Sequence, residues 1–322
     1  MNIAEKVKLI SRNTVEVITE NELKNLLEVN KSPRVYIGYE PSGDIHLGHL
    51  MTINKLLDMK KAGFKIVILL ADIHAYLNEK GSLEEVKEIA KLNMKVFKSL
   101  GLEDAEYVFG SNFQLSEKYI LDVHKFARIT TLRRARRSMD EVSRRKENPL
   151  VSQMIYPLMQ AVDIAHLKVN VALGGIDQRK IHMLARENLP KLGYNAPICV
   201  HTPILIGLDG EKMSSSKGNF ISVTDTEKEI EKKIMNAFCP KGEIKGNPII
   251  QIAKFHIFPR FSKMVVERDT KYGGDVEYRS FDELALDYAS GNLHPADLKK
   301  SIAFYLNDLL KDARKKMKEV II

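Results

Sequence analysis

Residues 35–72 run VYIGYEPSGDIHLGHLMTINKLLDMKKAGFKIVILLAD, and this stretch decides the fold class. The β-branched and aromatic residues of 35–40 predict a strand, and 50–63 carries apolar residues at helical spacing with a glycine at its end. The continuous apolar run 64–72 is typical of a strand covered on both faces. Strand, loop, helix and strand within about forty residues form a βαβ unit, which builds a parallel sheet.

The same alternation continues downstream. Apolar stretches at 105–111, 169–175 and 198–207 predict further strands, and 83–101 and 176–192 predict helices between them. We therefore expect an α/β, doubly wound (Rossmann-like) parallel sheet.

Near residue 224 the sequence pattern changes from alternating strands and helices to mainly helical segments. A Thr-x-x-Glu capping box at Thr224 and Glu227 predicts a helix start, and turns rich in Pro and Gly follow at 239–248 and 271–275. We predict two domains, 1–224 with the sheet and 225–322 mainly α-helical.

Composition excludes several classes of protein. No apolar run reaches the roughly 18–20 residues of a membrane helix, and the first residues lack the apolar core of a signal peptide, so we expect a cytoplasmic protein. Cys199 and Cys239 show no metal-ligand spacing, which leaves a zinc site or a disulfide unsupported. The excess of 50 basic over 42 acidic residues, +8, is compatible with a polyanionic partner.

The loop 41–49 carries candidate chemistry. His46 and His49 flank Leu-Gly at an expected helix start, where backbone N–H groups attract anions. Gly43 and Gly48 allow a ligand to approach the backbone. The pattern is neither a dinucleotide fingerprint nor a P-loop. This loop alone is compatible with a phosphate site and with a simple turn that caps a helix. A zinc site would need more ligands.

A second polar loop lies at 210–219, GEKMSSSKGN. Lys212 and Lys217 offer mobile positive charges, and three consecutive hydroxyls offer adaptable donors. By itself the stretch also fits a flexible linker between domains. Its pairing with the histidine loop favours binding of a triphosphate.

Together the two loops resemble a known family. PSGDIHLGH and KMSSSKGN, in this order on a doubly wound fold, are similar to the two ATP signatures of class I aminoacyl-tRNA synthetases. The chain more narrowly resembles the archaeal-type tyrosyl-tRNA synthetases. The likeness covers nearly its whole length through LLADIHAYLN, TTLRRARRSM, IYPLMQAVDI, GGIDQRKIHMLAREN and HPADLK.

The resemblance implies a tyrosine site. Tyr36 and Asp163 would pair with the phenol, which can both donate and accept a hydrogen bond. Tyr156, Gln160 and Gln178 would hold the α-ammonium end of the substrate. Tyr156 and Gln160 share a helix face with Asp163, whereas Gln178 lies outside this helix. The further implied pocket residues are Gly38, Glu40, Ala71 and His74, and His74 could equally be a satisfied histidine at a strand end.

It also implies ATP as a substrate with Mg²⁺, no bound prosthetic group and no covalent catalytic residue. His46, His49 and Lys212 would stabilise charge while the tyrosine carboxylate attacks the α-phosphate. The implied ATP-binding residues are Gly43, His46, Gly48, His49, Lys212, Met213, Ser214, Ser215 and Ser216, the last five forming the loop 212–216.

The implied partners are tRNA(Tyr), L-tyrosine, ATP and a second copy of the chain. A connective insertion at about 114–150 contains the basic run 131–148 and would build a homodimer interface. Arg137 and Arg179 would contact the acceptor end. Tyr272 (phenylalanine in relatives), His294 and Asp297 would read the anticodon, while Ala296 replaces the family's methionine.

Three other interpretations remain possible from the sequence. An adenylyltransferase could use the same histidine loop, but it would not need the C-terminal domain. An inactive RNA-binding relative should have lost His46, His49 or Lys212, and all three are present. A tryptophanyl enzyme shares both loops, yet Asp163 suits a phenol better than an indole, which only donates.

Overall fold

A computed structural model of the chain describes residues 1–41, 43–142, 147–211, 213 and 217–321, with side chains up to residue 317. By its internal contacts the chain divides into two compact units. The sheet unit comprises Met1–Gly43 and Lys55–Ile204, and the C-terminal unit comprises Asp44–Asn54 and Leu205–Ile322. Each is described by itself. The functional boundary near residue 224 stays a prediction, since this division falls after Ile204 and groups residues 44–54 with the C-terminal part.

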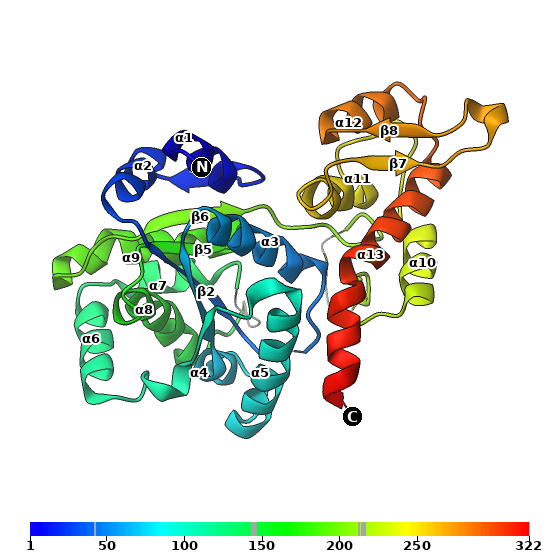
Figure 1. Cartoon of the computed structure of the whole chain (residues 1–322). Helices are drawn as coiled ribbons and strands as arrows, with labels where there is room; N and C mark the ends of the chain where they lie inside the picture. The colour runs from blue at the N-terminus through cyan, green and yellow to red at the C-terminus, as the bar shows by residue number, and fades with distance from the viewer. Residues whose placement is uncertain (42, 143–146, 212, 214–216, 322) are drawn as a thin grey trace. The chain divides into compact units, whose positions relative to one another are not determined.

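The sheet unit holds a six-stranded sheet in the order β1-β6-β5-β2-β3-β4 (Figure 1). All neighbouring strands pair in parallel except β1, which runs antiparallel to β6. The predicted doubly wound fold is confirmed, and the short antiparallel strand β1 is an addition that the sequence analysis missed. The strands are β1 (Glu16–Ile18), β2 (Arg34–Tyr39), β3 (Lys65–Leu70), β4 (Glu106–Phe109), β5 (Val171–Gly175) and β6 (Ile198–Thr202).

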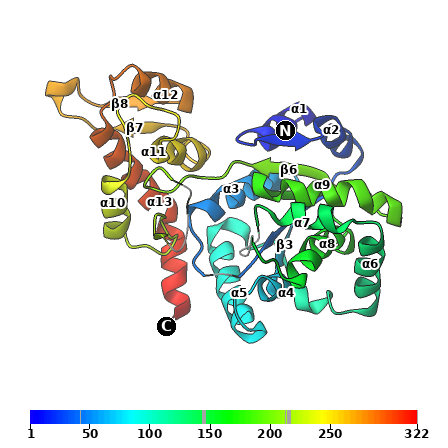
Figure 2. The ribbon, with the colours of Figure 1, turned by 180° about the vertical axis from the view of Figure 1, so that it is seen from behind.

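Helices flank this sheet, as Figure 2 shows from the opposite side. They are α1 (Ile3–Ser11), α2 (Glu20–Val29), α4 (Asp72–Leu77), α5 (Leu83–Phe97), α6 (Glu117–Arg128), α7 (Leu132–Met139), α8 (Val151–His166) and α9 (Arg179–Asn188). Helix α3 (Leu47–Lys61) spans the boundary between the units. Short helical turns are η1 (Lys98–Leu102), η2 (Gly110–Asn112), η3 (Ile176–Gln178) and η4 (Leu189–Leu192).

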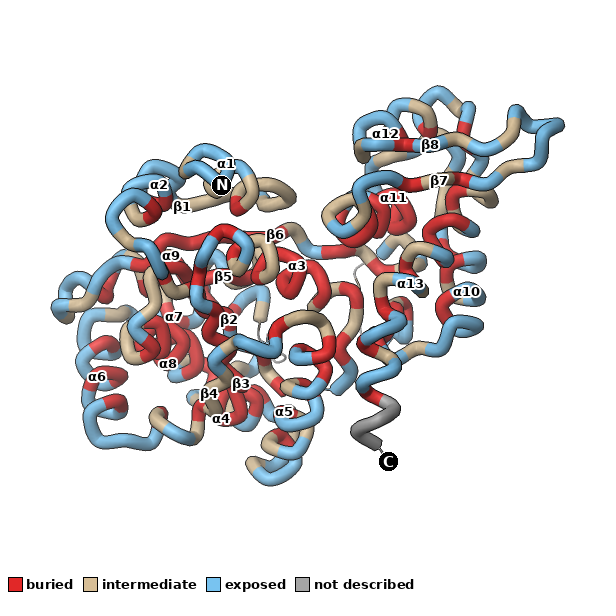
Figure 3. The backbone as a smooth tube through the Cα atoms, viewed as in Figure 1, coloured by how far each residue is buried: buried red, intermediate tan, exposed pale blue. Residues whose placement is uncertain are grey.

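The core explains why these segments form strands. Side chains alternate across a strand, and Tyr36 and Val67 point into one buried cluster with residues of α6, α8 and α9. On the other face the ring of Tyr39 lies 4.6 Å from that of Phe97 in α5. Strands β5 and β6 are almost wholly buried (Figure 3), as their continuous apolar sequences predict, and β2 is buried except at Arg34 and Gly38.

In the C-terminal unit, helices surround a two-stranded hairpin. The helices are α10 (Glu227–Asn236), α11 (Pro248–Ile252), α12 (Phe281–Ala289) and α13 (Pro295–Ile321), with the turns η6 (Ala253–Ile257) and η7 (Thr270–Tyr272); the strands are β7 (Met264–Val266) and β8 (Val276–Tyr278). The predicted capping box was wrong by two residues. Thr226 is the N-cap of α10 and pairs with Glu229, because Thr224 is bonded to the Ser222 hydroxyl instead.

Among the described residues, none of the helices is long and apolar enough to cross a membrane.

Candidate active site

The topology of the sheet unit marks one place for a ligand. Strand β2 pairs with β3 on one side and with β5 on the other, so the order of the chain reverses between β2 and β5. Ligands bind at such a switch point, beyond the carboxyl ends of the strands. Glu40 follows β2, Ala71 follows β3, and Gln178 follows β5. Residues predicted to bind the substrate tyrosine therefore gather at this edge of the sheet.

Helix α8 supplies three of the predicted pocket residues from one face. Tyr156, Gln160 and Asp163 are all buried, and Asp163 is completely inaccessible. The hydroxyl of Tyr156 donates to Glu40 Oε1 at 2.6 Å. Gln160 Nε2 donates to Gln178 Oε1 at 3.2 Å, which ties α8 to the turn after β5. The predicted spacing thus places these groups on a common polar face.

Asp163 has one bonded and one unpaired oxygen. Gln114 Nε2 donates to Oδ1 at 2.8 Å, and the Tyr119 hydroxyl donates to the same oxygen at 2.7 Å. Within the described residues Oδ2 has no hydrogen-bond partner; His74 Nε2 lies 3.5 Å away. A buried acceptor without a partner is costly unless a ligand satisfies it. The arrangement leaves Oδ2 free to accept from a bound hydroxyl.

Burial sets the ionisation of this pocket. It raises the pKa of Asp163 to about 7, against the lowering effect of the bonds from Gln114 and Tyr119. It lowers the pKa of His74 to about 3, so that imidazole is neutral at physiological pH. The pKa of Tyr36 is raised well above its usual value, first by burial and then by the nearby charge of Asp163. Neutral forms are favoured throughout, as expected where water is excluded.

The small pocket residues Gly38 and Ala71 and the ring of His74 each fit closely against their neighbours. A Cβ on Gly38 would lie 2.9 Å from the Tyr36 hydroxyl, so a side chain there would displace the phenol. Ala71 is buried between β3 and α4, and its N–H donates to the carbonyl of Tyr39 at 2.9 Å. His74 packs edge-on against the Tyr156 ring, with centroids 4.6 Å apart.

Sequence reasoning missed three polar residues of this pocket. Gln114 and Tyr119 bond Asp163, and Asn78 Nδ2 donates to both oxygens of Glu40 at 3.2 Å. No spacing in the sequence connects these positions to α8. Only the tertiary fold brings them there.

Residues 44–49 of the histidine loop belong to the C-terminal unit, and backbone hydrogen bonds hold them in place. Ile45 and Leu47 flank His46 and pair with the segment 221–223: Val223 N donates to Ile45 O at 2.9 Å, and Leu47 N to Ile221 O at 3.1 Å. His46 itself forms a β-bridge with Ser222. This pairing joins the histidine loop to the chain that follows the second polar loop, 210–219 (the serine loop), and His46 and Ser222 are 176 positions apart in the sequence.

Both imidazoles accept hydrogen bonds through Nδ1. Gly48 N donates to His46 Nδ1 at 3.0 Å, and His46 N donates to His49 Nδ1 at 3.2 Å. Burial lowers the pKa of His46 to about 4, despite the opposing charge of Asp44. A neutral ring that accepts at Nδ1 carries its proton on Nε2. Each ring can therefore present an Nε2–H donor to an anion.

Gly48 has a steric role in this arrangement. A Cβ at position 48 would lie 2.7 Å from His46 Cε1, too close for the ring to stay in place. Gly43 has φ of +118°, a conformation that favours glycine. Within the described residues no group of three or more His, Cys, Asp or Glu side chains could hold a metal ion.

The serine loop is only partly described. Lys212, Ser214, Ser215 and Ser216 lie outside the described residues, while Met213 Sδ lies 3.5 Å from the Cβ position built on Gly48. The two ends of the loop are joined: Leu208 N donates to Asn219 O at 2.9 Å, and Asn219 Nδ2 donates to Asp209 Oδ1 at 2.8 Å.

The predicted tRNA residues fall on two surfaces. Arg137 of α7 and Arg179 of α9 line one hollow of about 430 Å³ in the sheet unit, together with Arg134 and Lys180. In the C-terminal unit Tyr272 is 65% exposed, His294 is the residue before α13, and Asp297 lies in its first turn. Arg268 connects these segments, donating to Gly274 O at 2.9 Å and to Asn292 O at 3.1 Å.

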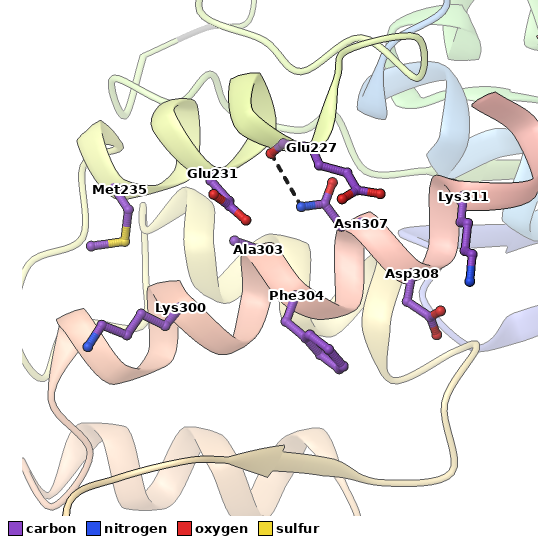
Figure 4. Close-up of a pocket in the computed structure, with 9 residues that line it drawn as sticks. All are labelled: Glu227, Glu231, Met235, Lys300, Ala303, Phe304, Asn307, Asp308 and Lys311. Carbon is purple, nitrogen blue, oxygen red and sulfur yellow. Dashed lines mark hydrogen bonds between the residues drawn. The ribbon is translucent and has the colours of Figure 1, made fainter. Parts of the chain in front are cut away.

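Another hollow, of about 540 Å³, lies in the C-terminal unit between α10 and α13 (Figure 4). Phe304 is 68% exposed at its edge. Its lining mixes three acidic side chains, Glu227, Glu231 and Asp308, with two lysines, Lys300 and Lys311. RNA phosphates require a clear excess of positive charge, and this hollow is not part of the predicted tRNA surface.

Comparison with known proteins agrees with this geometry. Residues 28–311 match the family model described as tRNA synthetases class I (W and Y), which defines the class of protein. The chain is 67% identical to the tyrosine–tRNA ligase of Archaeoglobus fulgidus over 319 residues, covering 98% of this chain and 99% of that protein. It is 57% identical to the Methanosarcina mazei tyrosine–tRNA ligase, over 97% and 99% of the two chains. Within the class, this chain belongs to the tyrosyl-tRNA synthetase family.

Solved structures agree with that assignment. The crystal structure of the Archaeoglobus fulgidus tyrosyl-tRNA synthetase complexed with L-tyrosine matches with a TM-score of 0.97 over 98% of this chain and all of that one. The Aeropyrum pernix tyrosyl-tRNA synthetase matches at 37% identity with a TM-score of 0.89, over all of this chain and 98% of that one. A tryptophanyl-tRNA synthetase at 20% identity shares the fold alone.

Proposed function

We propose that the polar pocket of the sheet unit holds tyrosine and that the histidine loop holds ATP during the two steps of a tyrosine–tRNA ligase. In the first step tyrosine reacts with ATP to give tyrosyl-adenylate and pyrophosphate. In the second the tyrosyl group passes to the 3′-terminal adenosine of tRNA(Tyr). The observation that carries the assignment is the pair of unpaired buried acceptors on α8, Asp163 Oδ2 and Gln160 Oε1.

The two acceptors match the two polar ends of the amino acid. The phenol donates to Asp163 Oδ2 and accepts from Tyr36, so a phenylalanine would leave both groups unpaired. The α-ammonium group donates to Gln160 Oε1, with the carboxylate of Glu40 and the amide of Gln178 nearby in the same pocket. The substrate therefore supplies hydrogen bonds to the buried groups that have no partner within the described residues.

Activation needs positioning and charge stabilisation. The tyrosine carboxylate attacks the α-phosphate, the bond to the bridging oxygen breaks, and pyrophosphate leaves with the negative charge. The Nε2–H groups of His46 and His49 donate to phosphate oxygens as charge develops. ATP enters as its Mg²⁺ complex, and Lys212 with Ser214, Ser215 and Ser216 supplies further donors. No protein nucleophile is required.

Transfer uses the hollow that contains Arg137 and Arg179. We propose that these side chains replace counterions at the acceptor end of tRNA(Tyr). At the other end Asp297 accepts from an anticodon base while the exposed ring of Tyr272 stacks on it. These contacts, a cytoplasmic location and the predicted domain boundary near residue 224 remain part of the proposal.

A homodimer is also part of the proposal. Eight of the nineteen large apolar side chains exposed in the described residues lie between residues 115 and 155. Such a concentration of exposed apolar groups marks an interaction surface. Its members are Leu115, Ile120, Leu121, Ile129, Leu132, Leu150, Val151 and Ile155.

Leu132→Glu tests this interface. Leu132 is 72% exposed, so the substitution should leave the fold intact but place a charge in the interface and shift the protein to monomers in sedimentation velocity. Leu286→Glu is the matched control, since Leu286 is 74% exposed in the C-terminal unit. Equal behaviour of the two variants would place the interface elsewhere.

ATP–pyrophosphate exchange with each of the twenty amino acids, without tRNA, tests the activation chemistry. We expect exchange with tyrosine and background rates with phenylalanine and tryptophan. Exchange with tryptophan would overturn the assignment of Asp163 and Tyr36 to the phenol. No exchange with any amino acid would favour an inactive RNA-binding protein.

A further inference from the structure

A chain of hydrogen-bonded polar groups, two of them buried histidines, lies behind Arg179. Arg179 Nε donates to Glu16 Oε1 at 2.7 Å, and the same oxygen lies 2.8 Å from His201 Nδ1. His201 Nε2 is in turn 3.0 Å from His182 Nδ1, and the two rings stack with centroids 5.1 Å apart. Neither histidine has a part in the reaction described above.

The direction of these hydrogen bonds follows from the groups themselves. A carboxylate only accepts, so His201 donates to Glu16 from Nδ1. Burial lowers the pKa of both histidines, to about 3 for His182, and both rings are therefore neutral. A neutral His201 that donates at Nδ1 accepts at Nε2, so His182 donates to it from Nδ1.

The first and last members of this series of hydrogen bonds are placed by neighbouring elements of the sheet and by one helix. Glu16 lies on β1 directly opposite His201 on β6 in the antiparallel register. His182 and Arg179 are three residues apart on α9, within one turn of the helix. His201 and His182 are almost wholly buried, whereas the side chain of Arg179 is 46% exposed. Two buried histidines thus support a partly buried Glu16, which holds one solvent-facing guanidinium group.

We infer that Glu16, backed by His201 and His182, is a positioning residue that orients Arg179 for the acceptor end of the tRNA. Glu16 engages Nε, and the two terminal nitrogens of the guanidinium keep their donors for phosphate or a base edge. This inference rests on the proposed placement of the tRNA acceptor end in the hollow of Arg137 and Arg179.

Within the described residues, Arg134 and Lys180 of the same hollow pair with carboxylates that lack such an anchor. Arg134 is paired with Glu187, and Lys180 with Asp140 and Glu141, all through exposed carboxylates. An ion pair exposed to water orients its members weakly, because both side chains retain many conformations. Arg179 differs because its carboxylate partner is itself held by a fully buried imidazole.

Glu16→Gln tests the inference in the full chain with tRNA(Tyr) transcript. The amide oxygen can still accept from Arg179 and His201, but it is neutral, so both hydrogen bonds lose the contribution of the carboxylate charge. We expect KM for tRNA in aminoacylation to rise about 3- to 10-fold, with a much smaller change in ATP–pyrophosphate exchange. Glu16→Asp shortens the side chain by one methylene and keeps the charge. Its KM for tRNA should lie between those of Glu16→Gln and the parent protein, and it replaces Glu16→Gln if that variant folds poorly.

Glu22→Gln is the matched control. Glu22 pairs with Arg186 of the same helix α9 at 2.6 Å, but Arg186 does not line the hollow. Loss of this pair should leave KM for tRNA unchanged. An equal rise in KM for both variants would show that α9 is merely loosened and would overturn the inference.

A double-mutant cycle with Arg179→Ala separates positioning from general stability. If Glu16 acts through Arg179, adding Glu16→Gln to Arg179→Ala should change KM for tRNA no further. Additive losses would overturn the inference, as would a lower KM in Glu16→Gln, which would mean that Glu16 only competes with RNA for the guanidinium. If Arg179→Ala itself leaves KM for tRNA unchanged, the proposed acceptor surface fails and the inference fails with it.

Discussion

The tyrosine pocket and the histidine loop are built in opposite ways. The pocket depends on side chains far apart in the sequence, such as Tyr156 and Glu40, which are 116 positions apart. In the loop the imidazole rings are oriented by bonds between residues two or three positions apart, such as Gly48 N to His46 Nδ1, although the loop backbone pairs with the segment 221–223. In the proposed function the pocket recognises tyrosine, whereas the loop binds the phosphate chain of ATP.

Burial acts on both regions and favours the neutral form in each. It raises the pKa of Asp163 to about 7 and lowers the pKa of His46 to about 4. In the pocket a ligand must restore the missing hydrogen bonds, and selectivity follows from that requirement. In the loop a neutral imidazole can still donate as phosphate charge develops. The comparison teaches that the polar side chains of the pocket are positioned by long-range packing, while the two imidazoles of the loop are oriented by their neighbours in the chain.

The largest effect is expected from Asp163→Ala. Removing the carboxylate leaves the phenol without its acceptor, and we expect kcat/KM for tyrosine in exchange to fall by about 10³-fold or more. Circular dichroism and thermal unfolding should show an intact fold. Unchanged activation would remove Asp163 from the tyrosine site and end the contrast between the two regions.

His49→Ala should act on the rate of activation. We expect kcat for adenylate formation to fall about 10²- to 10³-fold while the Kd for tyrosine, measured by equilibrium dialysis, changes less than about threefold. His49→Asn, which keeps an acceptor for the N–H of His46, should lose less. Equal losses in rate and tyrosine binding would count against a role in the transition state.

Gly48→Ala probes the loop without removing any functional group. The new Cβ would displace the His46 ring, and we expect kcat in exchange to fall about tenfold with little change in the tyrosine Kd. Gly218→Ala is a useful comparison for a loop glycine, since a Cβ there meets no atom within 4 Å, although its φ of +63° adds some strain. A normal rate in Gly48→Ala would show that the ring has room to move.

The smallest effect concerns pH and Tyr119→Phe. Because the pKa of Asp163 is about 7, its carboxylate form is lost as pH falls through that value, and KM for tyrosine should rise. The hydroxyl of Tyr119 lowers this pKa through its bond to Oδ1. Tyr119→Phe should therefore move the midpoint to higher pH and raise KM at pH 7 about fivefold. An unshifted profile between pH 5.5 and 8.5 would show that Asp163 does not control tyrosine binding.

The sequence by itself determined the sheet and the local chemistry. Apolar runs such as 64–72 predict buried strands because every residue faces a covering layer, and β3 lies within that range. His46, Gly48 and His49 could be grouped because they are neighbours in the chain. The helical spacing of Tyr156, Gln160 and Asp163 placed them on one face before any fold was known.

Only the tertiary structure decided which groups complete these sites. Strand β1 is three residues long and carries no periodic signal, so its pairing with β6 was not predicted. The bonds from Gln114 and Tyr119 to Asp163, and the link from Arg179 through Glu16 to His201, join segments with no common sequence pattern. Local patterns report the face that a residue occupies, whereas its partner across the core depends on how all the elements pack together.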